Sequence, residues 1–482
     1  MKLTRLLPAL LGLFTLSLSA AEKPDVLFIA VDDLNDWVGH LKGHPQARTP
    51  NIDRLVARGT TFTNAHCAAP ACNPSRAALM SGLRPWQTGI YTNDDPAGGV
   101  MKDTLTLNRH FLAQGYNTQG GGKIYHGGPS EGREDTWTKW MGLFDGTKNH
   151  EGNMNGLNNG HFDWGPLDSK TEEMGDYKLT DWAINELKTA PTDKPLFLAV
   201  GYVKPHLPWY VPKEYFDRFP LDSIQLPLVK EDDIDDLPKA GLNMAKPAGD
   251  HAAVIKANQW KQAVQAYLAT ISFLDDQVGR LLDGLDASPR KDKTIIVWWT
   301  DHGWALGEKQ HWRKFALWEE TTRTSCAIVV PGMTQPGSVC AAPVDYLNIY
   351  PTLCEVTGLP LPEHVKGASL VPLLKDPKAA WDHVAICSHG RGNHAVRDAQ
   401  WRYIRYADGS EELYDHTKDP NEWTNLAGEV GMSDIKTKLA TSLPAADSEV
   451  PAVAKKKEGK KGKGDGKNKG KKKKADKKKT EE

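Results

Sequence analysis

The sequence is poor in cysteine and, after its first residues, in long apolar runs. Six cysteines are spread over 482 residues, at positions 67, 72, 326, 340, 354 and 387. So few cysteines exclude the disulfide framework on which small secreted domains depend. Beyond residue 21, no segment is apolar over the roughly 20 residues that a membrane-spanning helix needs. We therefore expect that the chain is not an integral membrane protein.

The far end of the chain lacks aromatic and branched apolar residues altogether. Residues 455–482 hold fifteen lysines and five acidic residues, so the total charge of −1 conceals an acidic body and a basic tail. Such a segment cannot bury enough apolar surface to fold, and we expect residues 446–482 to be disordered. A solvated tail without a partner and contact with a polyanion both stay open. Specific nucleic-acid recognition is disfavoured, because no aromatic residue is present to stack on bases.

The first 21 residues have the parts of a secretory signal. Lys2 and Arg5 precede an apolar segment over residues 6–18, and small residues follow at 19–21. The apolar segment is too short to span a bilayer. We therefore expect residues 1–21 to be a signal peptide and the mature protein to be exported, to the periplasm or the extracellular space.

Between these ends, strand-like apolar runs alternate with helical patterns, which predicts an α/β fold with a large, mostly parallel sheet sandwiched by helices. Residues 26–31, 196–200 and 294–299 are continuous apolar runs, typical of buried parallel strands. Single cores stop growing at about 250–300 residues, so a chain of this length needs a second unit. We expect a main domain over 22–380 and a smaller C-terminal α+β subdomain with an antiparallel sheet over 381–445.

Acidic residues follow two of these runs, where parallel strands open onto a shared crevice. Asp32 and Asp33 come directly after the first run, and Asp301 and His302 follow the last. A solvated turn or helix cap would explain one such pair alone. Neighbouring carboxylates repel unless a cation lies between them, so two pairs behind buried strands favour a calcium or magnesium ion. Zinc is disfavoured, because the set contains one histidine only.

Residues 72–82 predict a helix with an anion site at its start. Pro74 suits the first helical turn, and Gly82 suits a C-terminal stop. Cys72 then lies at the positive end of the helix, where free backbone N–H groups attract anions. Arg76 adds a fixed cation one turn later. This combination suits a tetrahedral oxyanion.

Further segments offer cations and proton carriers. Lys123 and His126 lie in a glycine-rich stretch, where backbone can approach a ligand closely. Two prolines stiffen the backbone around His206, which follows an apolar run. Lys314 lies in an aromatic-rich loop. Each has an ordinary alternative: a surface turn for Lys123, a packed core histidine for His206, and an exposed lysine for Lys314.

Together these residues resemble the formylglycine-dependent sulfatases of the alkaline-phosphatase-like superfamily. The most specific motif is Cys-Asn-Pro-Ser-Arg at 72–76, and the other motifs occur in family order over about residues 25–320. Residues 301–308 look most like the iduronate-2-sulfatase branch. The resemblance implies that a modifying enzyme reads Cys-x-Pro-x-Arg and oxidises Cys72 to a formylglycine aldehyde.

The resemblance also implies a role for each candidate. One calcium ion would be bound by five side chains: Asp32, Asp33, Cys72, Asp301 and His302. Three cations would hold the sulfate oxygens: Arg76, Lys123 and Lys314. One hydroxyl of the hydrated aldehyde would attack sulfur while His206 protonates the leaving alcohol. His126 would then take a proton from the other hydroxyl, which expels sulfate and restores the aldehyde. Which histidine is the acid and which the base stays open.

Three functions stay open at this point. The first is hydrolysis of sulfate esters of a uronate-containing or otherwise polyanionic carbohydrate. The second is hydrolysis of phosphodiesters or phosphonate monoesters, also through a formylglycine. The third is anion binding by an unmodified Cys72. The loop over 388–394, with His389, Arg391 and His394, departs from the human-type enzyme in being much shorter. Because sulfatase C-terminal loops often border the substrate cleft, we expect this loop to help select the sugar.

Overall fold

The computed structural model describes residues 23–127, 136–142, 152–445 and 447. The predicted signal peptide lies outside these residues, and so does the predicted tail apart from residue 447.

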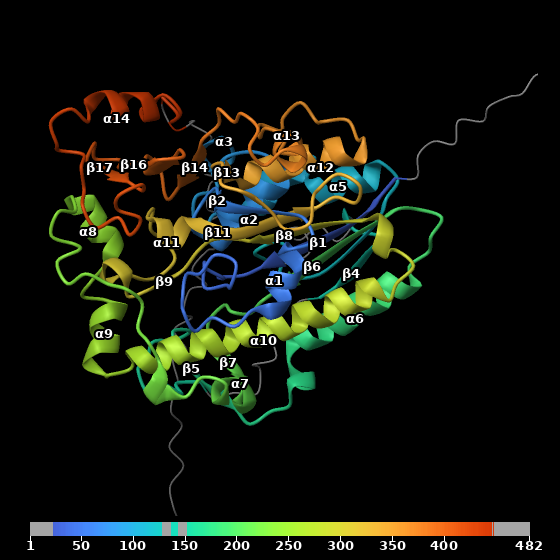
Figure 1. The fold of residues 1–482 in the computed structure, drawn as a ribbon, viewed down its shortest axis with the longest axis horizontal. Helices are drawn as coiled ribbons and strands as arrows, with labels where there is room; N and C mark the ends of the chain where they lie inside the picture. Colours follow the sequence, from blue (N-terminus) through green and yellow to red (C-terminus); the bar gives the residue numbers. More distant parts are fainter. Residues whose placement is uncertain (1–22, 128–135, 143–151, 446, 448–482) are drawn as a thin grey trace, which may run out of the picture.

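A nine-stranded sheet forms the centre of the molecule (Figure 1). Its order is β12-β2-β11-β8-β1-β6-β3-β4, and β13 also pairs with β2. The central β1 (Asp25–Val31) runs parallel to β6 (Leu196–Tyr202) and β8 (Thr294–Thr300). Among the described strands of this sheet, β11 (Arg323–Val329) alone runs antiparallel to its neighbours. The other members are β2 (Thr60–His66), β3 (Asn117–Gly122), β4 (Lys139–Met141), β12 (Ser338–Cys340) and β13 (Val344–Asp345). The prediction of a large, mostly parallel sheet is confirmed.

Helices cover both faces of this sheet, because its strands are apolar on both sides. Along β1, Leu27 and Ile29 join one apolar cluster, while Phe28 and Ala30 join the other. The first face carries α1 (Pro50–Val56), α6 (Gly175–Thr189) and α10 (Trp260–Asp286). The second carries α2 (Cys72–Ser81), α5 (Leu107–Ala113), α12 (Ile349–Thr357) and α13 (Val371–Lys375).

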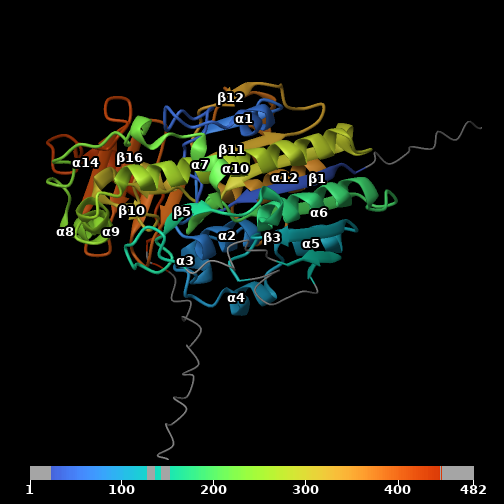
Figure 2. The ribbon, with the colours of Figure 1, turned by 90° about the horizontal axis from the view of Figure 1, so that it is seen from below.

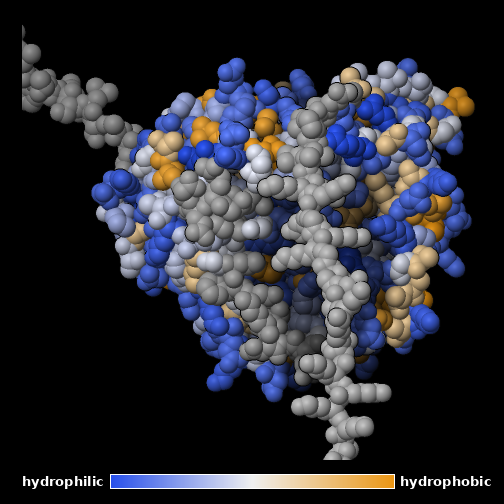
Figure 3. All heavy atoms as spheres, turned by 180° about the vertical axis from the view of Figure 1, so that it is seen from behind, coloured by the Kyte–Doolittle hydropathy of each residue, from blue (hydrophilic) through white to orange (hydrophobic). Residues whose placement is uncertain are grey.

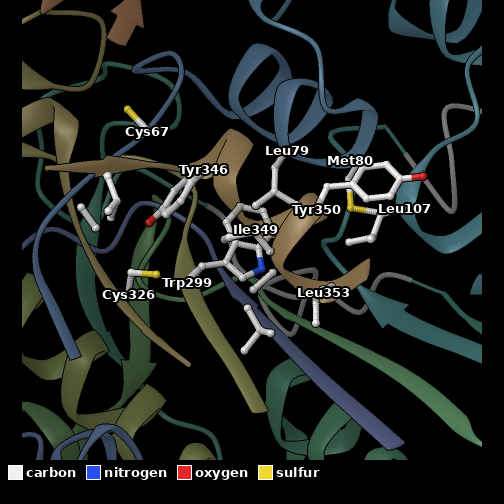
Figure 4. Packing of buried hydrophobic residues seen from close by; sticks show 14 of the residues in the cluster. Cys67, Leu79, Met80, Leu107, Trp299, Cys326, Tyr346, Ile349, Tyr350 and Leu353 are labelled. Carbon is white, nitrogen blue, oxygen red and sulfur yellow. The ribbon is translucent and has the colours of Figure 1, made fainter. Parts of the chain in front are cut away.

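The packing around α2 holds this helix deep in the molecule. Trp299 of β8 lies 5.5 Å, between ring centroids, from both Phe28 and Tyr346. Leu79 of α2 and Ile349 of α12 lie close to the Trp299 ring (Figure 4). Every residue of α2 is buried, so the start of the helix opens into the protein interior rather than to bulk water.

A second, antiparallel sheet lies at one end of the molecule (Figures 1 and 2). It consists of β14 (Ala385–Ser388), β15 (His394–Arg397), β16 (Trp401–Arg405) and β17 (Glu411–Asp415). Val396 and Leu413 pack with Leu439 of α14 (Ser433–Ala440), while Ile404 and Tyr414 join the main core. The predicted small α+β unit is therefore present. The division of the chain at 380/381 stays a prediction.

Shorter elements connect these layers. The helices among them are α3 (Pro85–Thr88), α4 (Ala97–Asp103), α7 (Lys213–Asp217), α8 (Lys239–Ala245), α9 (Asp250–Lys256) and α11 (Glu319–Thr322). The strands are β5 (Trp164–Leu167), β7 (Trp209–Pro212), β9 (Ala305–Leu306) and β10 (Trp312–Arg313).

Figure 3 shows one face of the molecule, on which the coloured residues are mainly hydrophilic and the apolar ones form small groups. None of the helices in the described ranges is long and apolar enough to cross a membrane. All six cysteines are free and buried, and the Cys67 and Cys387 sulfurs lie 3.7 Å apart.

Candidate active site

Five potential metal ligands converge at the carboxyl edge of the large sheet. The parallel register of β1 and β8 pairs Val31 with Thr300, so the polar residues that follow both strands meet. The start of α2 adds Cys72. One ligand atom from each of five side chains lies within 4.8 Å of the others, and all five are buried: Asp32, Asp33, Cys72, Asp301 and His302.

Asp33 is held in a backbone conformation that non-glycine residues rarely adopt, with φ at 60°. Its N–H donates to Asp301 Oδ1 at 3.0 Å, and its carbonyl accepts from the Tyr267 hydroxyl at 2.7 Å. The same hydroxyl accepts the N–H of Asn35 at 3.0 Å. These bonds stabilise the strained turn and aim the Asp33 carboxylate at the site. The sequence pattern of α10 marks Tyr267 as a core residue and gives no sign of this task.

Arg76 is bonded on all sides by protein acceptors. A guanidinium has five N–H groups, and the structure gives each a protein acceptor: Asp301 Oδ2 at 2.9 Å, Asp32 Oδ1 at 3.2 Å, and the carbonyls of Val31, Lys123 and Ile124. The side chain is fully buried and does not line the cavity described below. Arg76 therefore holds two carboxylates in place. Its predicted contact with sulfate oxygens stays a prediction.

Lys123 and Lys314 both lie beside the Cys72 sulfur. The Lys314 ammonium lies 2.9 Å from the Cys72 sulfur and 2.7 Å from Asp33 Oδ1. The Lys123 ammonium lies 3.7 Å from the same sulfur and also bonds the Asp32 carboxylate. Burial opposes ionisation of the Cys72 thiol, but these two lysines hold its pKa well below the usual range. Residue 72 therefore faces a strongly positive field.

Lys123 owes its place to a close approach between strand ends. Its N–H donates to the Gly201 carbonyl at 2.7 Å. A Cβ at Gly201 would lie only 2.4 Å from the Lys123 carbonyl carbon, so a larger residue at 201 displaces Lys123.

His126 and His206 both lie beside Cys72, and hydrogen bonds from their side chains help to lower the pKa of its thiol. His206 Nδ1 lies 2.5 Å from the Leu207 carbonyl and therefore donates to it. This leaves Nε2 facing the site, 3.7 Å from Asp33 Oδ2. His126 Nδ1 is buried and has no hydrogen-bond partner among the described residues. Both imidazoles are therefore available to substrate.

The five converging side chains fit a hard divalent cation. Asp33 Oδ2 is buried and has no hydrogen-bond partner within the described part of the chain. His302 Nδ1 donates to the Gly303 carbonyl at 2.9 Å, which leaves Nε2 as a ligand atom 3.3 Å from Asp33 Oδ1. Burial raises the pKa of Asp301 to about 8, although Arg76 and His302 oppose the shift. Oxygen atoms of three carboxylates dominate this set, which suits a hard divalent cation.

A cavity of about 350 Å³ opens over this cluster, large enough for a sugar. Its basic lining residues are Lys123, His126, His161, Lys204, His206, Arg313 and Lys314. Among the residues that line it in the described structure, Asp33 alone carries an acidic side chain. The cavity is therefore suited to an anionic substrate. Sequence reasoning did not single out His161 or Arg313.

Comparison with known proteins decides the family. Residues 24–359 match the sulfatase family model, and residues 307–449 match the model of the C-terminal region of N-sulphoglucosamine sulphohydrolase. The chain belongs to the sulfatase family. A sulfatase of Formosa agariphila is 40% identical over 89% of this chain and 87% of its own. Human iduronate 2-sulfatase is 29% identical over 84% of this chain and 78% of its own. This sulfatase is thus an enzyme, which removes simple anion binding as an alternative.

Solved structures support the alkaline-phosphatase-like fold of this sulfatase. One relative, in complex with its substrate D-glucosamine-2-N,6-O-disulfate, has a TM-score of 0.71 and 22% identity, and covers 88% of this chain and 97% of its own. A phosphonate monoester hydrolase from Silicibacter pomeroyi has a TM-score of 0.74 and 20% identity, and covers 87% of this chain and 94% of its own. At these identities the comparison shows the fold alone.

A second cluster of buried charges joins the two sheets of this sulfatase. Arg402 of β16 bonds Glu319 of α11, and its Nε lies 2.5 Å from Glu422 Oε1. His416 Nε2 lies 2.9 Å from the same oxygen. Arg397 Nε also lies 3.4 Å from Glu319 Oε2, so two arginines balance the two acids and the cluster is an ion-pair network rather than a second metal centre. Sequence reasoning missed it, because its members are distant in sequence.

The 388–394 loop approaches the cavity wall of this sulfatase at one point. The His389 ring lies 5.8 Å from the ring of Phe315, which lines the cavity. Arg391 lies over the Tyr91 ring at 5.0 Å, and His394 Nδ1 lies 2.8 Å from Ser388 Oγ. Neither Arg391 nor His394 lines the cavity. A role for the loop in selecting the sugar stays a prediction.

Proposed function

We propose that this sulfatase hydrolyses sulfate esters of a uronate-containing or otherwise polyanionic carbohydrate. The observation that carries the proposal is the setting of Cys72, with two lysine ammonium groups within 3.7 Å of its sulfur and a cation-rich cavity in front of it. The names of two relatives, a human iduronate 2-sulfatase and an enzyme bound to a glucosamine disulfate, support this substrate class.

The working form of residue 72 in this proposal is formylglycine, and the cation held beside it is calcium. The hydrated aldehyde supplies a hydroxyl nucleophile, and calcium supplies positive charge that stabilises the reacting sulfate group. Calcium would be held by Asp32, Asp33, Asp301, His302 and residue 72.

The other side chains then have defined tasks. Lys123 and Lys314 bind the sulfate oxygens from the cavity side, and Arg76 keeps Asp32 and Asp301 in place. His206 Nε2 gives a proton to the leaving alcohol, and His126 takes one at residue 72. The assignment of acid and base between these histidines rests on the family resemblance.

Two measurements test this function. Conversion of the Cys72 thiol to an aldehyde lowers the mass of the peptide that contains it by about 18 Da. A panel of sulfated saccharides, followed by identification of the desulfated position, then defines the substrate. Conversion at residue 72 without sulfate release from any member of the panel overturns the proposal.

We also propose that the protein is exported, that residues 1–21 are removed, and that the basic tail contacts polyanions. The composition of the two ends supports these proposals. N-terminal sequencing of the protein recovered from outside the cytoplasm tests the export. Retention of residues 1–21 there contradicts it.

Hydrolysis of phosphonate monoesters or phosphodiesters is the second candidate function. The observation in its favour is the TM-score of 0.74 with a phosphonate monoester hydrolase, which bears on the fold alone. Parallel assays with matched aryl sulfates, phosphonate monoesters and phosphodiesters separate the two. A clear preference for the phosphorus esters would replace the sulfatase assignment.

A further inference from the structure

One cation of the cavity lies outside the cluster around Cys72. Arg313, Lys314 and Phe315 are consecutive, and all three line the cavity. In an extended segment, successive side chains point to opposite sides. Here Arg313 has a φ of 72° and Phe315 a φ of 79°, both in the left-handed region that side chains disfavour. These two backbone conformations cost free energy, and they occur where three consecutive residues line one cavity. This combination points to a function for the residues beside Lys314.

The Arg313 guanidinium is held in a fixed orientation. Its Nε and Nη2 donate to Asp250 at 2.6 and 3.2 Å. Its central carbon lies 4.5 Å from the centroid of the Phe162 ring. Asp250 also accepts from the Asn159 amide at 2.7 Å, which fixes the carboxylate in turn. The arginine side chain is nevertheless 28% exposed, so substrate can reach it.

One edge of this guanidinium is left for a ligand. Asp250 occupies the Nε edge, and no protein acceptor in the described ranges bonds Nη1. A guanidinium edge with parallel N–H groups matches the paired oxygens of a carboxylate or a sulfate. Arg313 is therefore oriented in advance for a planar or tetrahedral oxyanion.

The sulfate ester that reacts at residue 72 does not need this cation. Lys123 and Lys314 already face that position, and both contact the Cys72 sulfur in the structure. We propose that Arg313 binds a second anionic group of the substrate, a carboxylate or a second sulfate on the reacting sugar or its neighbour. The inference rests on the proposed function and defines its substrate: a carbohydrate with at least two negative groups.

The test compares matched substrates. A 2-O-sulfated uronic acid is paired with its methyl ester, and glucosamine-2-N,6-O-disulfate with glucosamine 6-O-sulfate. We expect wild type to prefer the more anionic member of at least one pair. Arg313→Gln should lower that preference, as a ratio of kcat/KM, by about tenfold, mainly through KM, because a charge-assisted hydrogen bond is lost. The pair that responds tells carboxylate from sulfate.

Arg218→Gln is the matched control. Arg218 also bonds an aspartate, Asp276 at 2.8 Å, and lies 4.3 Å from the Tyr215 ring centroid, but it does not line the cavity. Arg218→Gln should leave the preference for the more anionic substrate unchanged. Two results overturn the inference. One is that wild type shows no preference within either pair of substrates; the other is that Arg313→Gln lowers kcat/KM equally for both substrates of a pair.

A binding measurement separates this inference from the proposed function. Calorimetry with Cys72→Ala, which cannot form the aldehyde, should show that the preferred substrate binds about tenfold more weakly once Arg313→Gln is added. Equal affinity of the single and double variants overturns the role of Arg313. If wild type binds the substrates of both pairs but releases no sulfate, the proposed function is contradicted. The role of Arg313 is then decided by the calorimetric affinities alone.

Discussion

The ammonium of Lys314 lies 2.9 Å from the sulfur of Cys72, although 242 residues separate them in the sequence. The contact is possible because the loop after β10 turns Lys314 toward the start of α2, where Phe315 donates its N–H to the Pro70 carbonyl at 3.0 Å. The lysine is buried and also bonds Asp33, so its charge is fixed at the reacting position rather than free in solvent. Its burial opposes protonation, but Asp33 and Cys72 raise its pKa above the usual range, which keeps it charged.

Lys314→Met should abolish most turnover while leaving the fold intact. A fixed cation at a developing negative charge accounts for about 10²–10³ in kcat at comparable sites. We expect kcat for sulfate release to fall by that factor. A loss confined to KM would contradict the placement of Lys314 at the reacting group.

Arg76→Lys tests whether Arg76 mainly holds the carboxylates of Asp32 and Asp301 or mainly binds sulfate oxygens. Because the five N–H groups of Arg76 bind carboxylates and carbonyls, a lysine leaves buried acceptors unpaired. We expect weaker calcium binding and a loss of about 3 kcal/mol in the free energy of unfolding, measured by calorimetry and denaturant titration. A variant with normal stability and calcium affinity but a raised KM would instead support the predicted contact of Arg76 with sulfate oxygens.

Calcium removal should inactivate the enzyme and lower its thermal stability together. The donor cluster places three carboxylates within one small buried region. Arg76, Lys123 and Lys314 offset part of their repulsion, and calcium would offset more of it because it would lie among all three. At a calcium concentration 100 times its Kd, the ion stabilises the folded state by about 2.7 kcal/mol. Scanning calorimetry with chelator, and again after calcium is restored, measures the change. An unchanged Tm after complete removal of calcium speaks against the site.

Gly201→Ala should reduce kcat through displacement of Lys123. The added Cβ meets the Lys123 backbone at 2.4 Å, so the two strand ends must separate. Gly428→Ala is the control, since a Cβ there meets nothing within 4 Å. We expect at least a tenfold loss of kcat in the first variant and none in the second. Equal kinetics in both would show that Lys123 does not depend on this contact.

Asp275 should make stability fall as the pH rises. Burial raises its pKa to about 6, against hydrogen bonds from the N–H groups of Ile52 and Asn51 at the start of α1. The folded state therefore holds this proton more tightly than the unfolded chain. Between about pH 4 and 6 the carboxyl ionises at a cost of about 3 kcal/mol in the free energy of unfolding. Denaturant titrations between about pH 4 and 6 should show a steeper fall of the free energy of unfolding in wild type than in Asp275→Asn, while other buried acids such as Asp301 titrate in both. Equal slopes in the two proteins would contradict the prediction.

Much of the site follows from the sequence. The apolar runs that became β1, β6 and β8 predict buried parallel strands, and residues that follow such strands share one edge of the sheet. The meeting of Asp32 and Asp33 with Asp301 and His302 was therefore predictable. So was the position of Cys72 at the start of a helix, since Pro74 and Gly82 mark both ends of α2.

The direction of single side chains was not predictable. Arg76 lies one turn into α2, and its sequence position says nothing about whether it faces the ligand or the carboxylates beneath. Arg313 lines the cavity and has a positive φ, a conformation that nothing in an arginine residue favours. The pairing of Arg402 with Glu319 depends on how the small sheet docks on the large one, which is a tertiary property.

The rate of sulfate release as a function of formylglycine content tests the central claim most directly. Preparations made with different amounts of modifying enzyme are assayed on the preferred sulfated saccharide, and the converted fraction of residue 72 is measured by mass spectrometry. The account predicts that kcat is proportional to that fraction and that Cys72→Ala has none of the activity. Equal turnover by unconverted and converted preparations would contradict it.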